Sequence, residues 1–365
     1  MYVSKVEVFK ARIKLRRPFR IALGEHTVVE DYIVRIETKD GLVGYGEASP
    51  SKAILGDDLT STLETLKLLA KRLIGIDPTG YERWRDLLRG KDLSSSARAA
   101  LDIALSDLIA KHYGVPLYKL LGDAKTKIET DYTIGIKSPE EASKEAAELA
   151  RKGFRIIKVK LGEGKEADIQ RVRSVREAVG PKVRIRVDAN QGWDFETARE
   201  IIREIAKYDI ELVEQPLKHY DLKGLAKLKR LSPIPIMLDE SVHTAEDAIY
   251  AIRMDAADVI NIKLMKSGGL WEAVRIAHVA EAADIPCMVG CMSEAEVGII
   301  AGIHFACGLS NVVFADLDAD LMMTEHVVSA NTLDVPYRVP PSEPGLGFNE
   351  DQVNYDILEK VLEVK

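Results

Sequence analysis

Lysines and acids recur at regular intervals through the middle of this 365-residue chain, each directly after a short apolar run. In chain order they are Lys158 and Lys160 in IKVKLG, Asp188 in IRVDAN, Glu214 in LVEQP, Asp239 in MLDES and Lys263 in INIKLM. From Lys160 onward, successive members are separated by 24–28 residues. One βα unit has about this length, so each residue is expected at the same position of a successive strand. Together they would form a ring around one mouth of a barrel.

The three acids predict a metal site. Any one of them alone is explained as the cap of the following helix. Three consecutive strands that end in carboxylates are different, because packed carboxylates repel and raise one another's pKa. A hard divalent cation removes that penalty, and oxygen ligands favour magnesium or manganese over zinc. We therefore expect Asp188, Glu214 and Asp239 to hold one Mg²⁺ per subunit, with Mn²⁺ as a possible substitute.

The three lysines predict proton transfer. Lys158 and Lys160 are two residues apart on a strand and point to the same face, here the barrel interior. Lys263 lies four strands further on, which is diametrically opposite in an eight-stranded ring. Burial and nearby cations lower a lysine pKa and make it a usable base. Two opposed bases would remove and return a proton at the carbon next to a carboxylate, whose enediolate a metal stabilises.

Two kinds of segment must position these residues. Residues 2–17, 28–38 and 42–48 have strand character, with a hairpin turn at 39–41, and helical patterns follow at 57–74, 80–89, 95–112 and 115–121. Strands followed by helices indicate an α+β unit, which we place at 1–125. From residue 126 seven amphipathic stretches separate eight apolar runs, at 127–135, 155–161, 183–188, 210–214, 235–239, 258–264, 286–290 and 311–316.

This alternation predicts an α/β architecture in which parallel strands close into a TIM-type barrel over 126–325. A doubly wound open sheet is the alternative, but no Gly-rich dinucleotide turn follows the first strand. Residues 326–365 contain no further repeat and are expected to return to the N-terminal unit.

The bulk composition is that of a soluble globular enzyme, with 46% hydrophobic and 30% charged residues. A net charge of −7 argues against a nucleic-acid partner. Charges interrupt every apolar run before it reaches membrane-spanning length, and the N-terminus lacks the apolar core of a signal peptide. Three cysteines cannot form a disulfide framework, so we expect a cytoplasmic protein with reduced thiols. A homo-oligomer of unspecified order is also expected.

Over essentially the whole chain these features resemble the enolase superfamily, within it the muconate lactonizing enzyme subgroup. The resemblance implies a modified (β/α)7β barrel with an α+β capping domain. The subgroup's K-x-K motif matches Lys158-Val159-Lys160, which implies Lys160 as one acid/base and Lys263 as the other. It implies the same metal ligands as the carboxylate spacing, namely Asp188, Glu214 and Asp239.

The end of the eighth strand, FADLDAD, narrows the substrate class. It places Asp316 and Asp318 two residues apart and therefore on one face. Dipeptide epimerases of this subgroup have a D-x-D motif there that binds the free amino terminus of the substrate. Two carboxylates form a natural cradle for an ammonium group. The resemblance thus implies an isomerase that epimerises dipeptides by two-base 1,1-proton transfer.

Other residues are assigned by position. Thr133 on the first strand and Met292 and Ser293 after the seventh are expected to line the pocket, while Asn190 and Gln215 would orient metal ligands. Lys266 falls in a loop near two glycines, for which a phosphate- or solvent-facing role is expected.

The loop after Pro18-Phe19 bears on the second residue of the substrate. Epimerases acting on Ala-Glu carry a basic residue in this loop, where the present chain has a glycine. Arg20 is the candidate substitute, and a hydrophobic or broader preference is expected in place of one for Glu.

Several alternatives use the same machinery. N-acylamino-acid racemases, o-succinylbenzoate synthases and muconate-type cycloisomerases share the lysines and the metal, but their substrates lack the cation that two acids would bind. A metal-holding barrel that binds peptides without turnover is the non-enzymatic alternative. Intact Lys160 and Lys263 count against it, because binding alone requires no opposed bases.

Overall fold

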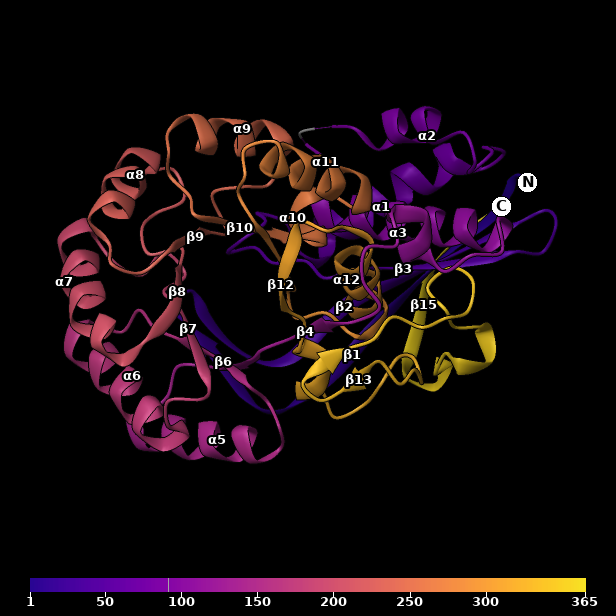
Figure 1. The fold of residues 1–365 in the computed structure, drawn as a ribbon. Coiled ribbons are helices and arrows are strands. Elements are labelled where there is room, and N and C mark those ends of the chain that lie inside the picture. Colours follow the sequence, from indigo (N-terminus) through magenta and orange to yellow (C-terminus); the bar gives the residue numbers. More distant parts are fainter. Residues whose placement is uncertain (91) are drawn as a thin grey trace.

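The computed structural model describes residues 1–90 and 92–365. An antiparallel sheet with its own helices lies beside a ring of strands surrounded by helices, and both chain ends lie at the sheet (Figure 1). No helix in the described residues combines the length and the apolar composition needed to cross a membrane.

The N-terminal sheet has the strand order β15-β1-β2-β3. Its strands are β1 (Val3–Ile21), β2 (Gly24–Thr38), β3 (Val43–Ala48) and β15 (Leu358–Val364). The C-terminal strand β15 pairs antiparallel with β1, which returns the end of the chain to its beginning.

Strands β1 and β2 form one long hairpin. Pairing resumes beyond a bulge after Lys14 and continues from Phe19↔His26 to Ile21↔Gly24. The segment expected as a loop after Pro18 is therefore the tip of a hairpin, so the strands extend beyond the predicted 2–17 and 28–38. Strand pairing stabilises a tip that local sequence alone does not.

In the described part of the capping domain the helices are α1 (Leu59–Leu73), α2 (Tyr81–Leu88), α3 (Ser95–His112) and α4 (Leu117–Leu121). Helix α3 packs directly on β3 because Gly44 and Gly46 carry no side chain there. A Cβ on Gly46 would lie 1.9 Å from the carbonyl oxygen of Ala100, and one on Gly44 would lie 2.3 Å from that of Ala104. These glycines permit a backbone approach that any other residue would block.

Eight parallel strands form the barrel, in sequence order around the sheet from β5 to β12. They are β5 (Tyr132–Ile134), β6 (Ile156–Lys160), β7 (Arg184–Asp188), β8 (Ile210–Glu214), β9 (Ile236–Leu238), β10 (Val259–Lys263), β11 (Cys287–Gly290) and β12 (Val312–Asp316). Thr130, two residues before β5, forms a parallel bridge with Ala315 of β12, which brings the two ends of the sheet together. The predicted TIM-type barrel is confirmed.

The first predicted strand, 127–135, is split in the structure. Only β5 belongs to the barrel, whereas β4 (Ile128–Glu129) joins β14 (Tyr337–Arg338) and β13 (Leu333–Asp334) in a small sheet. The sequence shows one continuous run because β-propensity does not indicate which partner a strand will find.

Helices follow the strands and cover the outside of the barrel (Figure 1). They are α5 (Pro139–Arg151), α6 (Lys165–Val179), α7 (Phe195–Ile205), α8 (Leu222–Leu231), α9 (Ala245–Arg253), α10 (Leu264–Ser267), α11 (Leu270–Glu281) and α12 (Glu296–Gly308). Several begin at side-chain caps. Ser138 and Glu141 form a capping box at α5, and Asp194 accepts a hydrogen bond from the Thr197 amide at α7. Such caps end these connecting loops at a defined residue.

Candidate active site

The predicted ring of charged residues lies at the carboxyl ends of five neighbouring strands. Lys158 and Lys160 end β6, Asp188 ends β7, Glu214 ends β8, Asp239 follows β9 and Lys263 ends β10. The parallel register sets Lys160 beside Asp188 and Asp188 beside Glu214. All six side chains are buried.

Each of the two opposed lysines contacts its own carboxylate. The Nζ atom of Lys160 donates a 2.6 Å hydrogen bond to Oδ2 of Asp188. Across the barrel, Nζ of Lys263 donates to Oδ2 of Asp239 at 2.8 Å. Gly290, which is paired with Lys263 on the next strand, leaves room for it, because a Cβ there would lie 3.1 Å from Cε of Lys263. The lysines are therefore held in fixed positions on β6 and β10.

Lys158 lies between the acids. Its Nζ atom is 2.6 Å from Oε2 of Glu214, 3.2 Å from Oδ2 of Asp188 and 2.7 Å from Oδ2 of Asp316. Burial alone would lower the pKa of Lys158, but Asp316, Glu214 and Asp188 raise it well above its ordinary value. Lys158 is thus a fixed cation.

The pKa values of these buried groups are set by burial and by the charges of their neighbours. Burial would raise the pKa of Asp188, but Lys160 and Lys158 lower it below its ordinary value. Burial together with the Asp188 charge raises the pKa of Glu214 to about 7. Burial lowers the pKa of Lys263, but Asp239 and Glu214 more than reverse this and raise it. Lys263 is therefore protonated while it is paired with Asp239.

These three acids fit a hard divalent cation. Among the described residues, Oε2 of Glu214 and Oδ1 of Asp239 are buried and accept no hydrogen bond. Nζ of Lys158 lies 2.6 Å from Oε2 of Glu214, and Nζ of Lys266 lies 2.6 Å from Oδ1 of Asp239. Neither contact has the geometry of a hydrogen bond. Buried carboxylate oxygens on adjacent strands with free lone pairs are a suitable ligand set for magnesium.

Asn190 and Gln215 lie where the sequence predicted them, next to the acids. The backbone amide of Asn190 donates to Oδ1 of Asp188 at 2.8 Å. The Gln215 side chain accepts from the Asp239 amide at 2.9 Å. Asn261, which sequence reasoning missed, donates from Nδ2 to Oε1 of Glu214 at 2.7 Å. Its position two residues before Lys263 on one strand places it on the same face, which was the available signal.

Lys266 departs from expectation. It is 2% exposed and does not face solvent. Its Nζ atom lies 2.6 Å from Oδ1 of Asp239. The short helix α10 turns the chain back toward the strand ends, which the sequence pattern of a glycine-rich loop does not reveal.

The acids Asp316 and Asp318 meet on the far side of the mouth from Asp239. Thr133 bridges them, since its amide donates to Oδ2 of Asp318 at 2.5 Å and its hydroxyl donates to Oδ1 of Asp316 at 3.1 Å. Burial and the Asp316 charge raise the pKa of Asp318 to about 7. Burial would also raise the pKa of Asp316, but Lys158 and Lys160 lower it.

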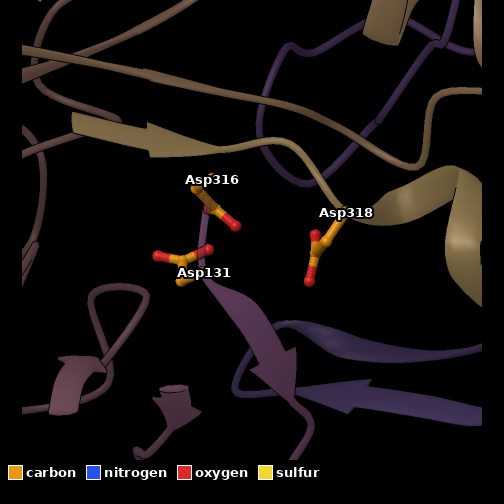
Figure 2. Close-up of side chains that lie close together, drawn as sticks. All are labelled: Asp131, Asp316 and Asp318. Atoms are coloured by element: carbon orange, nitrogen blue, oxygen red, sulfur yellow. The ribbon is translucent and has the colours of Figure 1, made fainter. Parts of the chain in front are cut away.

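A third acid, Asp131, joins this pair. Figure 2 shows the three carboxylates facing a common space, and one oxygen from each lies within 4.8 Å of the others. Asp131 is fully buried and accepts a 2.8 Å hydrogen bond from Nη1 of Arg186. Sequence reasoning missed Asp131, which lies between β4 and β5, two residues before Thr133. Because Arg186 and Lys158 already supply two positive charges, the cluster suits one further monovalent cation.

A cavity of about 340 Å³ connects the lysines to these acids. Lys160, Lys263, Asp316, Asp318, Thr133, Met292, Ser293 and Asn190 line it. The hairpin tip covers it with Phe19, Ile21, Leu23 and His26. Arg20 does not line this cavity. Its side chain is 50% exposed and pairs with Oε1 of Glu163 at 2.9 Å. Alternation along β1 turns it away from the neighbours Phe19 and Ile21.

A capped barrel with buried lysines and acids around one mouth is the architecture of a barrel enzyme. Comparison with known proteins gives the same class. The family model of the mandelate racemase / muconate lactonizing enzyme N-terminal domain matches residues 3–122, and the enolase C-terminal domain-like model matches residues 141–353.

Similar proteins include the hydrophobic dipeptide epimerase of Enterococcus faecalis, 43% identical over 87% of this chain and 91% of that protein. The structure of the dipeptide epimerase from Enterococcus faecalis V583, complexed with Mg and L-Leu-L-Tyr, has a TM-score of 0.93 at 41% identity, covering 95% of this chain and 99% of that one. The N-succinyl Arg/Lys racemase from Bacillus cereus has a TM-score of 0.95 at 33% identity, covering 100% and 99%.

The chain belongs to the mandelate racemase and muconate lactonizing enzyme family of the enolase superfamily. It is accordingly an isomerase, of the racemase and epimerase kind.

Proposed function

We propose that this protein is a magnesium-dependent dipeptide epimerase that works by two-base 1,1-proton transfer. The observation that carries the proposal is the placement of Lys160 and Lys263, which end strands β6 and β10 and both line the same cavity of about 340 Å³. A substrate α-carbon between them would have one lysine on each face. One lysine in its neutral form takes the proton, and the other, as an ammonium, returns one to the opposite face.

Asp188, Glu214 and Asp239 would hold the magnesium ion. When bound, the cation supplies positive charge that stabilises the enediolate of the substrate. Asn190 and Asn261 donate to the carboxylates of Asp188 and Glu214 and would keep them oriented, as hydrogen-bonded neighbours of metal ligands do. Gln215 would fix the backbone of Asp239. Lys158 would add a fixed positive charge below the substrate carboxylate.

A free amino terminus on the substrate is supported by Asp316 and Asp318. Thr133 holds both acids at the end of the cavity, and a buried ammonium needs such carboxylate partners. The similar protein from Enterococcus faecalis was crystallised with the dipeptide L-Leu-L-Tyr, whose amino terminus is free.

An N-succinyl amino acid racemase is the second candidate, supported by the similarity to the Bacillus cereus protein. The α-nitrogen of an N-acylated substrate is an uncharged amide, however, so such a substrate would bring no α-ammonium group to the buried Asp318 carboxylate. A muconate-type cycloisomerase substrate would do the same. The pair of acids at this end of the cavity therefore favours the dipeptide.

The apolar part of the cavity lining supports a hydrophobic second residue. Most side chains that cover the cavity are apolar, namely Leu15, Phe19, Ile21, Leu23, Val28, Val29, Ile54, Met322 and Met323. Burying an apolar substrate side chain against them is favourable by about 25 cal/mol per Å². His26 and Lys52 also line the cavity, and they are the positions that would favour an acidic side chain.

The test is a screen of L,L-dipeptides in deuterated water, in which epimerisation is read by mass and chiral separation. We expect turnover of dipeptides with an apolar second residue, such as Ala-Leu, above that of Ala-Glu. N-acetylation of Ala-Leu should lower kcat/KM by about one to two orders of magnitude, because a charge-assisted hydrogen bond is worth roughly 1.5–3 kcal/mol.

The variant Asp318→Asn is the matched control for the amino-terminal contact. It should lower kcat/KM for Ala-Leu strongly and for N-acetyl-Ala-Leu little. A wild-type enzyme that prefers N-acyl or N-succinyl amino acids would overturn the dipeptide assignment and leave the proton transfer intact.

A further inference from the structure

The Lys266 side chain is a buried cation directly behind Asp239. It lies on the short helix α10, three residues after Lys263, and is 2% exposed. Its Nζ atom forms an ion pair with Oδ1 of Asp239 at 2.6 Å. It also donates hydrogen bonds to the carbonyl oxygen of Asp239 and, at 3.0 Å, to that of Asn261.

Two of these contacts are hydrogen bonds to backbone carbonyls, and the third is an ion pair. A buried ammonium without partners would be strongly unfavourable, so these three oxygen atoms hold Lys266 in a restricted position. Two of the acceptors are backbone carbonyls on the segments that end β9 and β10. Lys266 therefore has a fixed position relative to both Asp239 and Lys263.

The two oxygens of Asp239 are divided between two lysines. Oδ1 faces Lys266 at 2.6 Å, and Oδ2 accepts from Lys263 at 2.8 Å. The opposite side of the site is built differently. The Oδ2 atom of Asp188 faces Lys160 and Lys158, whereas its Oδ1 accepts from the neutral backbone amide of Asn190. A second lysine behind the carboxylate is thus a feature of the Lys263 side.

We propose that Lys266 is a positioning residue for the Lys263 half of the reaction. Through its contact with Oδ1, it fixes the orientation of the Asp239 carboxylate, so that Oδ2 faces Lys263. A carboxylate without this partner would be free to rotate, and Lys263 would lose its fixed acceptor. The part of this proposal that concerns α-proton exchange rests on the two-base function proposed above. The part that concerns the orientation of Asp239 does not.

The test uses Lys266→Met, which keeps most of the length of the side chain and removes the charge, and Lys266→Arg, which keeps the charge. Lys229→Met is the matched control, because Lys229 pairs with Asp255 at 2.6 Å on the outside of the barrel. Two quantities are measured: Mg²⁺ affinity by calorimetry, and α-proton exchange in deuterated water from each epimer of Ala-Leu. The Lys263→Ala variant identifies the epimer that faces Lys263, since that epimer loses exchange.

We expect Lys266→Met to weaken Mg²⁺ binding by roughly 10–100-fold, as loss of a partner of a metal ligand does. Exchange from the epimer facing Lys263 should fall by at least about tenfold more than exchange from the epimer facing Lys160. Lys266→Arg should restore part of both, and Lys229→Met should change neither.

Equal loss on both faces with unchanged Mg²⁺ affinity would make Lys266 a structural residue and overturn the proposal. If the wild-type protein exchanges no dipeptide proton, the proposed function fails. The calorimetric comparison then still decides whether Lys266 orients Asp239.

Discussion

The Nζ atom of Lys158 donates a 2.7 Å hydrogen bond to Oδ2 of Asp316. This contact joins strand β6 to strand β12 across the barrel interior. It connects the half of the site that has the proposed metal ligands with the half that contains Asp316 and Asp318, the acids proposed to bind the amino terminus of the substrate. One buried cation is therefore shared between two groups of carboxylates.

Replacing Lys158 with Met should destabilise the protein. The change leaves Glu214, Asp188 and Asp316 without a common partner, and removal of one member of a buried ion pair typically costs about 3–5 kcal/mol. Urea denaturation measures this loss in the free energy of unfolding. Adding Mg²⁺ should recover part of it, because the cation would replace charge at Asp188 and Glu214. A variant as stable as the wild type in chelator would contradict this account of Lys158.

Replacing either opposed lysine should stop epimerisation and leave half of the exchange chemistry. In Lys263→Ala, the epimer facing Lys160 should still exchange its α-proton slowly with deuterated water, and Lys160→Ala should show the reverse. The physical reason is that each lysine reaches one face of the α-carbon. The measurement is mass spectrometry of each recovered epimer. Full epimerase activity in either single variant rules out the two-base mechanism.

Removal of divalent cations should abolish turnover, and added Mg²⁺ should restore it. Glu214→Gln should weaken Mg²⁺ binding sharply, because it removes one charge from a set of three carboxylates. Calorimetry of the chelated and reloaded protein measures this effect. Glu325→Gln, an exposed acid that does not line the cavity, is the control. Activity that persists in chelator would show that Asp188, Glu214 and Asp239 hold no required metal.

The free energy of unfolding should fall as the pH rises from 4.5 toward 8, in part through Glu294. This side chain is buried, and burial raises its pKa from 4.5 to about 8. Between these values the folded state keeps a proton that the unfolded chain has released. The stabilisation from this proton is therefore complete below pH 4.5 and is lost as the pH rises past about 8.

The measurement is urea denaturation across this pH range at fixed Mg²⁺ concentration. Glu294→Gln can still accept the 2.8 Å hydrogen bond from the Met292 amide, so its stability should depend less steeply on pH than that of the wild type. Glu325→Gln should keep the wild-type slope. Parallel slopes for Glu294→Gln and the wild type would show that Glu294 does not hold this proton.

The hairpin tip and Arg20 illustrate what pattern analysis could not provide. Whether Arg20 faces the cavity depends on the pairing of Phe19 with His26, which is a contact between two strands. Its partner Glu163 comes from the loop after β6, far away in the sequence. Neither relation leaves a periodic signal, because the first depends on the register of the hairpin and the second arises only when the capping domain and the barrel are packed together.

By itself the sequence determined the barrel and the ring of Lys160, Asp188, Glu214, Asp239 and Lys263 at its mouth. These are consequences of local rules, namely the alternation of side chains along a strand and the constant length of a βα unit. Only the tertiary structure decided that Lys266 lies behind Asp239, that Asp131 lies against Asp316 and that apolar side chains cover the cavity. Those contacts join segments that lie apart in the sequence, and no sequence pattern indicates that the segments meet in space. They are decided by packing, where a buried charge must find a partner wherever the fold supplies one.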